Sequence, residues 1–423
     1  MRCAELKVLV YGINYSPELT GIGKYTGDMG PWLVGRGAQV KIVTAPPYYP
    51  DWAMSFDYRN RFVREAINGV DVIRCPLYVP RSPTAFTRLL HLLSFSVTSI
   101  LPMLFQIFWR PNVIIVIAPS ILCAPTGLLV AALCGAKTVL HIQDYELDAM
   151  FGLNMMKNTG GRMMRLATSV ERWLLRRFDR VSTISFSMMR RAQEKGVDES
   201  KIMHTPNWVD TDFVAPSISG ARYRALFGFT PDHKIVLYSG NIGEKQGLSM
   251  VLEAAALYMS NSQVQFMIVG NGVQREELVG LSEKLKLTNV HFSNLVPYED
   301  LPDLLAMADV HLVVQRKGAA DVVLPSKLAS ILALGGHALI TAEQDTELAL
   351  LVERYPGIAC LVEPEDLSAF VAGLDVLLST DTRIVNDVAR DYAVEKLAKD
   401  AVLTEFLAHL STLAGAHEFR RDH

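Results

Sequence analysis

The sequence has few cysteines, and none of them stands in a spacing that would hold a metal ion or a redox pair. The 423 residues include five cysteines and no Cys-x-x-Cys or Cys/His motif, which argues against a zinc site or thiol redox chemistry. Most of them lie in apolar runs, so we expect small, reduced core residues, as is usual for cytosolic proteins. They are Cys3, Cys75, Cys123, Cys134 and Cys360.

The chain also lacks a strong net charge. Its 41 Lys and Arg against 44 Asp and Glu leave −3, which gives no electrostatic reason to expect a nucleic-acid partner. With 50% apolar and 20% charged residues, the composition is that of a folded globular protein. Basic residues do cluster in one stretch, which could meet anionic lipid or form a solvated helix face. They are Arg162, Arg165, Arg172, Arg176, Arg177 and Arg180.

The N-terminus lacks the uninterrupted apolar segment of a signal peptide, because Glu5 and Lys7 interrupt it. Residues 6–11 instead look like a buried first strand. We therefore expect a cytoplasmic protein.

The chain is too long for one ordinary hydrophobic core and suits two domains of roughly 200 residues each. In both halves, short β-branched runs alternate with longer helical stretches, which predicts right-handed crossovers and a parallel sheet covered on both faces. The strands expected are 7–11, 39–44, 70–74, 113–117, 137–142 and 180–184 in the first half, and 234–239, 265–269, 290–292, 310–314, 338–341 and 358–361 in the second.

The predicted fold class is therefore α/β, with two Rossmann-like, doubly wound domains at residues 1–208 and 232–388. A stretch with proline, serine and glycine, residues 209–231, is the expected linker. Two such domains would place the ligand in a cleft at the carboxyl ends of both sheets.

One segment breaks the alternating pattern. Residues 89–108 form a run of about 20 residues without formal charge, which is long enough to cross a bilayer. Spanning would put strands 7–11 and 113–117, which look like parts of one sheet, on opposite sides of the membrane. We favour an interfacial helix, flanked by arginines at both ends, over a spanning or a merely buried one.

Glycines follow the first strand just before a helix. Gly21 and Gly23 stand where a backbone could approach a phosphate, and a helix N-terminus favours negative charge. Together with Gly27 they suggest a dinucleotide fingerprint, although several residues separate them from the strand. Gly23 is a candidate phosphate contact or a plain turn glycine.

The second half opens in the same way, with a strand, a glycine loop and a helix. Two such loops opening two Rossmann-like halves are a stronger signal than one, and they predict a second phosphate cradle with Lys245 as a point charge. The following strand ends in a further glycine pair, where a nucleotide base could sit. The candidate donor-binding residues are Gly240, Asn241 and Gly243 in the first loop and Gly270, Asn271 and Gly272 in the second.

Two more clusters stand where such folds place their sites. Pro325 and Ser326 form a plausible helix start that would aim backbone N–H groups and Lys327 at an anion, although a capped structural helix would look the same. His141 and Asp144 stand at the end of a strand in the first half, where polar groups face the ligand crevice.

The sequence gives little reason to expect a metal ion or another cofactor. Asp210-Thr211-Asp212 matches a metal-binding Asp-x-Asp motif, but it lies in the linker and does not follow a buried strand.

With these segments in place, the chain resembles glycosyltransferase family 4, whose GT-B architecture has two Rossmann-like domains facing across a cleft. The likeness covers nearly the whole chain and is nearest to the transferases of colanic-acid biosynthesis. Residues 389–423 look like the family's C-terminal helix, which crosses back to the first domain. The most specific stretches are 11–25, 44–50, 141–153, 205–210, 240–247 and 324–340.

This resemblance implies a nucleotide-sugar donor held by the second domain and an acceptor held by the first. It suggests GDP-fucose as the donor, a lipid-linked oligosaccharide as the acceptor, and retention of the anomeric configuration without a metal ion. The protein would then work in exopolysaccharide synthesis, attached peripherally to the inner face of the plasma membrane.

The donor site departs from the family's pattern. Many relatives carry Gly-Arg-Leu-x-x-x-Lys-Gly in the second-domain loop, whereas here Asn241 replaces the Arg and Lys245 stands one residue before the usual Lys. The family's paired glutamates are also replaced. Asp321 lies near the first position, and Ser330 occupies the second, where ribose contact would be expected.

The mechanism that follows has two parts. Lys245 and Lys327 would stabilise the negative charge that builds on the leaving diphosphate. His141 or Asp144 would orient or deprotonate the acceptor hydroxyl.

Three other interpretations stay open. A nucleotide-sugar 2-epimerase that acts on UDP-GlcNAc has the same architecture but needs no lipid acceptor. An NAD-linked oxidoreductase is suggested only by the spacing of Gly21 and Gly23. A non-catalytic nucleotide-binding membrane protein is suggested by the replaced glutamates.

Overall fold

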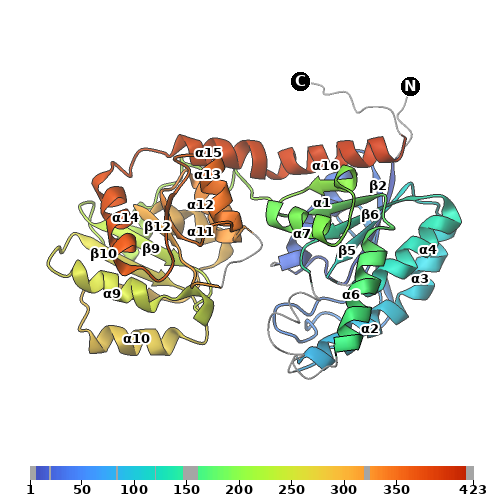
Figure 1. The fold of residues 1–423 in the computed structure, drawn as a ribbon, viewed down its shortest axis with the longest axis horizontal. Coiled ribbons are helices and arrows are strands. Elements are labelled where there is room, and N and C mark those ends of the chain that lie inside the picture. Colours follow the sequence, from blue (N-terminus) through green and yellow to red (C-terminus); the bar gives the residue numbers. More distant parts are fainter. Residues whose placement is uncertain are drawn as a thin grey trace. The chain divides into compact units, whose positions relative to one another are not determined.

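The computed structural model describes residues 6–18, 21–81, 84–119, 121–145, 161–318 and 324–415. The chain divides into two compact units; in Figure 1 most of unit 1 is blue to green, with its C-terminal part in red, and unit 2 runs from green to red. Unit 1 comprises residues up to Pro206 together with those from Leu403 onward, and unit 2 comprises Asn207–Val402.

Unit 1 is built on an eight-stranded sheet in the order β3-β4-β2-β1-β5-β6-β7-β8. All neighbours are parallel except β3, which pairs antiparallel with β4. The six strands predicted for the first half are confirmed to within one residue at their ends. The strands are β1 (Lys7–Tyr11), β2 (Gln39–Thr44), β3 (Val63–Ile67), β4 (Val70–Arg74), β5 (Val113–Ala118), β6 (Lys137–Ile142), β7 (Arg180–Thr183) and β8 (Ile202–His204).

Helices cover both faces of this sheet. The crossovers into β5, β6, β7 and β8 all advance in one direction along the sheet, so right-handed connections place their helices on one face, and α1 lies on the other. Figure 1 shows α2, α3, α4 and α6 gathered on one side of the unit. The helices are α1 (Gly21–Gly35), α2 (Ala85–Thr98), α3 (Ile100–Phe105), α4 (Ala124–Cys134), α6 (Gly161–Leu175) and α7 (Phe186–Glu194), with short turns η1 (Gln106–Phe108), η2 (Ile121–Cys123) and η3 (Glu199–Lys201).

The apolar segment expected at residues 89–108 is a broken helix, α2–α3–η1, that packs on unit 1. Thr84 begins α2 with a reciprocal capping box, and Ser99 separates α2 from α3. The Tyr11 hydroxyl on β1 lies 2.6 Å from Ser99 Oγ, which fixes the break against the sheet. The segment Phe86–Phe108 is long and apolar enough to span a membrane, and 39% of its most apolar stretch is buried within the protein.

Unit 2 contains a six-stranded, fully parallel sheet in the order β11-β10-β9-β12-β13-β14. The strands are β9 (Lys234–Ser239), β10 (Val264–Val269), β11 (Val290–Ser293), β12 (Val310–Val313), β13 (Ala338–Thr341) and β14 (Cys360–Val362). The helices and turns are α8 (Ala221–Leu226), η4 (Glu244–Gln246), α9 (Ser249–Leu257), α10 (Arg275–Lys284), η5 (Tyr298–Asp300), α11 (Leu301–Ala306), α12 (Ser326–Leu334), α13 (Glu347–Arg354), α14 (Leu367–Ser379), α15 (Asp387–Tyr392), the π-turn η6 (Ala393–Leu397) and α16 (Lys399–Leu413), which continues into unit 1.

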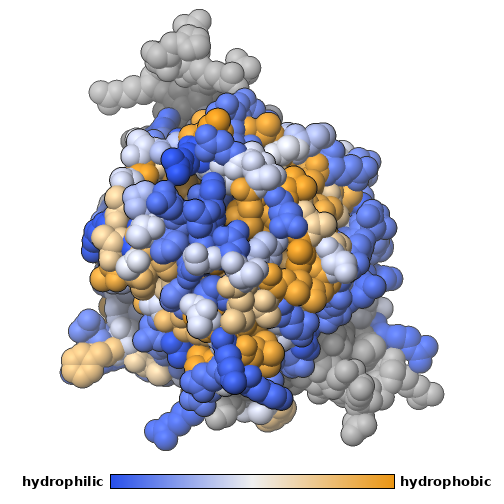
Figure 2. Space-filling model, turned by 90° about the vertical axis from the view of Figure 1, so that its left-hand side faces the viewer, coloured by the Kyte–Doolittle hydropathy of each residue, from blue (hydrophilic) through white to orange (hydrophobic). Residues whose placement is uncertain are grey.

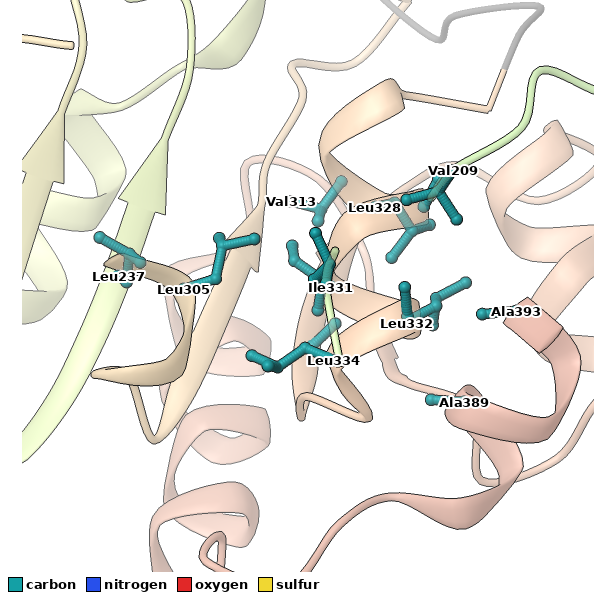
Figure 3. Packing of buried hydrophobic residues seen from close by; sticks show 14 of the residues in the cluster. Val209, Leu237, Leu305, Val313, Leu328, Ile331, Leu332, Leu334, Ala389 and Ala393 are labelled. Carbon is teal, nitrogen blue, oxygen red and sulfur yellow. The ribbon is translucent and has the colours of Figure 1, made fainter. Parts of the chain in front are cut away.

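Helix α12 is anchored in the core on one face of this sheet. Figure 3 shows Leu328, Ile331 and Leu332 pointing from α12 into a cluster that includes Val209 and Ala393. Full burial of a leucine or isoleucine side chain contributes roughly 1.5–3 kcal/mol, so three of them hold the helix firmly. This anchoring matters because Lys327 stands at the start of the same helix.

The segment expected as a linker, residues 209–231, packs into unit 2. Val214, Tyr223 and Phe229 belong to the same core cluster, and Val209 N–H donates to the carbonyl oxygen of Leu397 at 2.8 Å. The expected C-terminal tail is divided, because residues 389–402 pack with unit 2 and residues 403–415 with unit 1.

Candidate functional site

Each sheet has one point at which the strand order reverses. In unit 1 it falls between β1 and β5, and in unit 2 between β9 and β12. Open parallel sheets bind ligands at the carboxyl ends of the strands on either side of such a point. Ligand-binding residues are therefore expected at these two edges.

In unit 2, two glycine loops at this edge press together backbone to backbone. Gly240 N–H donates to the carbonyl oxygen of Val269 at 2.9 Å, and Ile242 N–H donates to that of Asn271 at 2.9 Å. Gly240, Gly270 and Gly272 have φ values of 147°, 158° and 157°. The structure thus brings together the two loops that the sequence predicted as donor-binding.

The close approach explains why these positions are glycine. A Cβ atom on Gly270 would overlap the carbonyl oxygen of Gly240, and one on Gly272 would overlap that of Ile242. Asn271 and Gly272 are exposed at the tip of their loop. A ligand at this edge would meet bare backbone, which suits a phosphate or a nucleotide base.

Lys327 and the start of α12 lie beside the first loop. The Lys327 ammonium lies 4.3 Å from the centre of the Tyr238 ring, and its Cδ is close to Gly240. The Tyr238 hydroxyl in turn donates to the carbonyl oxygen of Asn241 at 2.5 Å. Pro325 is the N-cap of α12, and its side chain makes no capping hydrogen bond to the first backbone N–H groups of the helix. A lysine beside a helix N-terminus favours an anion.

Lys245, Gly243 and Ser330 complete the described part of the predicted donor site. Lys245 is exposed in η4, Gly243 is buried at the start of that turn, and Ser330 is partly buried on α12. Ser326 is exposed at the first position of α12. Asp321 lies outside the described residues.

Arg316 is a residue at this edge that the sequence did not single out. It follows β12, and its backbone N–H donates to the carbonyl oxygen of Lys245 at 2.8 Å. Its side chain fills the space that a Cβ on Gly247 would occupy. Its guanidinium also lies 3.6 Å from the Glu244 carboxylate. Arg316 therefore adds a second cation to the turn that carries Lys245.

In unit 1, Glu18 ties the loop after β1 to the loop after β2. It is 5% exposed, and its carboxylate accepts from the N–H groups of Tyr48 and Tyr49, both at 3.1 Å. Asn14 Nδ2 donates to the same carboxylate at 2.9 Å. Burial raises the pKa of Glu18 above its ordinary value, and these three donors oppose that shift.

Glu18 also explains why residue 23 is a glycine. A Cβ on Gly23 would overlap the Glu18 carboxylate, so this position needs a glycine for packing whether or not it meets a phosphate. Gly21 has a φ of 60° and lies near the Tyr49 ring. Sequence reasoning did not single out Glu18, because two of its three partners, Tyr48 and Tyr49, are distant along the chain.

Buried Arg74, at the end of β4, braces the same two loops. Its guanidinium donates to the carbonyl oxygens of Ala45 at 2.8 Å and Ser16 at 2.6 Å, and it also binds Glu65. The edge beside β1 and β2 is thus held by a buried arginine and a buried carboxylate.

His141 is buried in a chain of hydrogen bonds. The Gln143 amide nitrogen can only donate, so it donates to His141 Nε2 at 2.8 Å. Nδ1 then carries the proton and donates to Ser182 Oγ at 3.0 Å, and Ser182 donates to Thr205 Oγ1 at 2.8 Å. Burial lowers the pKa of His141 to about 4, so the imidazole is neutral near pH 7. Both ring nitrogens are engaged within the protein.

Asp144 follows β6 and is exposed, unlike His141. Of the two predicted acceptor-side groups, Asp144 is therefore the one whose side chain solvent can reach. Residues 146–153, the rest of this predicted segment, lie outside the described residues.

The described residues contain no group of three or more His, Cys, Asp or Glu side chains that could hold a metal ion. Asp210, from the Asp-x-Asp motif, accepts from the backbone N–H groups of Asp212 and Phe213 at 3.1 and 2.9 Å. Its carboxylate closes a turn.

Two parallel-sheet units, with braced glycine loops at a switch point, define a nucleotide-binding α/β fold of the GT-B type. Residues 20–208 match the family model of the glycosyl transferase 4-like domain, and residues 221–392 match that of the glycosyl transferases group 1. The chain is 50% identical over 407 residues to WcaI of Escherichia coli strain K12, which covers 95% of this chain and 99% of that protein. The name of that relative places it among the glycosyl transferases of colanic acid biosynthesis. The chain therefore belongs to glycosyltransferase family 4.

Solved structures share the fold at low sequence identity. Sucrose-phosphate synthase of Thermosynechococcus elongatus superposes with a TM-score of 0.69 at 16% identity, over 97% of this chain and 100% of that one. HepE of Anabaena, solved in complex with UDP and glucose, superposes with a TM-score of 0.67 at 14% identity, over 96% and 100%. These likenesses confirm the predicted fold class.

Proposed function

We propose that this glycosyltransferase moves fucose from GDP-fucose to a lipid-linked oligosaccharide during the synthesis of a colanic-acid-like exopolysaccharide. The 50% identity to WcaI over nearly the full length of both chains supports the pathway. The reaction would proceed with retention of the anomeric configuration and without a metal ion.

The observation that carries the proposal is the edge of unit 2 beside β9 and β12. Two loops there present bare backbone, and Lys327 packs against Tyr238 at the start of α12, where Pro325 makes no capping hydrogen bond. When the sugar–phosphate bond breaks, negative charge builds on the leaving diphosphate. Preorganised cations and N–H groups stabilise such charge by a few kcal/mol per group. Lys245 on the η4 turn and Arg316, which packs against that turn, would add to this stabilisation.

On the acceptor side, Asp144 is the candidate for orienting or deprotonating the hydroxyl. Its support is its exposed place directly after β6. His141 instead has both ring nitrogens bonded inside unit 1, which suits a role in holding the end of β6 in place.

The protein would act at the inner face of the plasma membrane, attached peripherally through α2–α3–η1. One side of this segment is buried within unit 1 through His91, Leu92, Phe95 and Met103, and the other side exposes Leu93, Val97, Leu101 and Phe105. Because β4 before it and β5 after it lie in one sheet, a helix in the interface agrees with the fold better than one that crosses the bilayer.

The experiment that tests the donor is thermal unfolding with GDP, GDP-fucose, UDP, UDP-GlcNAc and NAD. A ligand at about 100 times its dissociation constant stabilises the fold by roughly 2.7 kcal/mol. For a unit of this size, that raises the unfolding temperature by about 5–10 °C. We expect GDP and GDP-fucose to raise it. A shift with UDP and UDP-GlcNAc alone would overturn the donor and favour an epimerase, and a shift with NAD would favour an oxidoreductase.

Transfer of radiolabelled fucose to an extracted lipid fraction tests the reaction itself. We expect the wild-type protein to transfer label to the lipid. The Asp144→Ala variant should lose this transfer, while GDP still raises its unfolding temperature. Nucleotide binding without any transfer would instead favour a non-catalytic binding protein.

A further inference from the structure

The outer face of α6 carries an apolar stripe that points away from the protein. Leu166, Val170 and Trp173 follow each other at helical spacing and are 65%, 48% and 55% exposed. The opposite side of the helix is buried through Leu174 and Leu175. A surface helix normally has one apolar face, directed at the core, so the second stripe on α6 needs another explanation.

Arginines accompany this stripe, and no acid of the helix balances them at the surface. Arg172 and Arg177 are exposed on either side of Trp173 in the sequence, and the Arg177 guanidinium lies 4.7 Å from the Trp173 ring. Glu171 is the single acid between residues 165 and 177. It is buried, and its carboxylate pairs with Lys195 Nζ at 2.6 Å. The exposed charge of this stretch is therefore entirely positive.

The α6 stripe belongs to the same helical layer as α2–α3 and α4. The connections into β5, β6 and β7 advance in one direction, so these helices lie on one face of the sheet. Within the layer, α4 packs against α3 and η1, and both α2 and α4 pack against η2 (Figure 1). Leu129 and Leu133 of α4 are also more than half exposed. Exposed apolar side chains thus occur on all three members of the layer.

We propose that the outer faces of α2–α3, α4 and α6 form one lipid-binding surface, and that α6 makes it selective for anionic lipid. This inference rests on the peripheral membrane attachment proposed above and adds its partner, a bilayer with negatively charged headgroups. In such a surface the apolar side chains insert into the bilayer interface, the tryptophan lies at the level of the headgroups, and the arginines bind the lipid phosphates. Figure 2 shows a face of unit 2, on which hydrophobic areas lie among hydrophilic residues.

Vesicle binding without nucleotide tests the charge part of the inference. The full-length protein is mixed with vesicles of phosphatidylcholine alone and of phosphatidylcholine with an equal amount of phosphatidylglycerol, and bound protein is separated by flotation. We expect stronger binding to the anionic vesicles. The double variant Arg172→Gln/Arg177→Gln should lose most of this preference, at roughly fivefold in affinity per arginine. High salt should reduce the preference in the wild type as well.

A matched variant removes the same charge elsewhere. Lys284 and Lys396 are exposed in unit 2, so Lys284→Gln/Lys396→Gln should bind both vesicles as the wild type does. Equal binding of the α6 double variant and the wild type to anionic vesicles would overturn the inference, as would wild-type protein that binds neither vesicle.

Fluorescence tests whether Trp173 itself enters the bilayer. Lipids with brominated chains should quench part of the tryptophan emission of the wild type, and less of it in Trp173→Phe. Identical quenching in both proteins would remove α6 from the surface. Because neither assay uses the donor, the inference can stand if fucose transfer fails, and it can fail while transfer stands.

Discussion

Gly270 shows how the lack of one side chain allows the two glycine loops of unit 2, which carry the candidate donor-binding residues, to pack together. Its φ of 158° is a conformation that favours glycine, and a Cβ there would overlap the carbonyl oxygen of Gly240. The two loops can touch this closely only because Gly270 lacks a side chain.

Gly270→Ala should therefore separate the loops. We expect a loss of roughly 2–4 kcal/mol in the free energy of unfolding of unit 2, together with weaker nucleotide binding. Thermal unfolding with and without GDP measures both. Gly280→Ala is the matched control, because Gly280 lies in α10 with nothing within 4 Å of its Cβ position. It should be neutral or stabilising by about 0.5–1 kcal/mol. Similar behaviour of the two variants would contradict this explanation.

Lys327 allows a prediction about chemistry. Lys327→Ala should lower kcat/KM by roughly 10²–10³, because one preorganised group facing a developing negative charge has about this effect. The unfolding temperature without ligand should change little, since the core of α12 lies at Leu328, Ile331 and Leu332. Lys284→Ala serves as the control. Unchanged fucose transfer by Lys327→Ala would remove this lysine from the site.

Among individual residues, the sequence predicted those that can be recognised from their immediate neighbours along the chain. Gly240 and Gly270 directly follow strands, and their spacing is visible in the sequence. Arg316 and Arg74 act through segments distant along the chain, one packing against Gly247 and the other binding Ser16. No short motif marks such partners, so sequence reasoning missed them. The roles of the predicted site residues in binding and catalysis stay predictions.

Among the elements, sequence reasoning missed two strands of unit 1: β3, in which no residue is fully buried, and β8, which has three residues. Strand β5 is buried at all six positions, whereas β3 alternates partly buried and exposed residues and includes two charged ones. A signal for β3 did exist. Asn68 and Gly69 join β3 to β4 with φ values of 49° and 80°, the residue pair and conformation that close a tight hairpin.

The segment α2–α3–η1 gives the prediction at the scale of elements. If it lies in the interface, alkaline carbonate should release the wild-type protein from a membrane fraction, since no helix crosses the bilayer. Leu93→Glu/Val97→Glu/Leu101→Glu should leave the protein soluble, because three exposed apolar side chains are replaced by charges. Each apolar side chain contributes up to roughly 1.5–3 kcal/mol on burial in lipid.

The control for this experiment places charges on exposed apolar residues of unit 2. Leu226 and Leu257 are 67% and 60% exposed, and Leu226→Glu/Leu257→Glu should stay with the membrane. Wild-type protein that resists carbonate would instead favour a spanning segment.

For the whole molecule, each of the two units buries a neutral histidine in its sheet. Burial lowers the pKa of His141 on β6 and of His311 on β12 to about 4, and for His311 the neighbouring His337 adds to the effect. In the unfolded chain, a histidine titrates near 6.5. Between these values the unfolded state binds more protons, so the stability of both units is fully present above pH 6.5 and declines as the pH falls toward 4.

Each histidine should thus make its own unit sensitive to acid. The expected slope is up to about 1.4 kcal/mol per pH unit, or roughly 3–5 °C in the unfolding temperature of a unit of this size. His141→Gln should flatten this slope for unit 1 and His311→Gln for unit 2, even if each variant is less stable at neutral pH. Calorimetry from pH 7 to pH 4.5 measures the slopes, and His409→Gln, on the exposed side of α16, should change neither. If His141→Gln flattened both transitions equally, the two units would unfold as one cooperative body, and the acid response would belong to the whole chain.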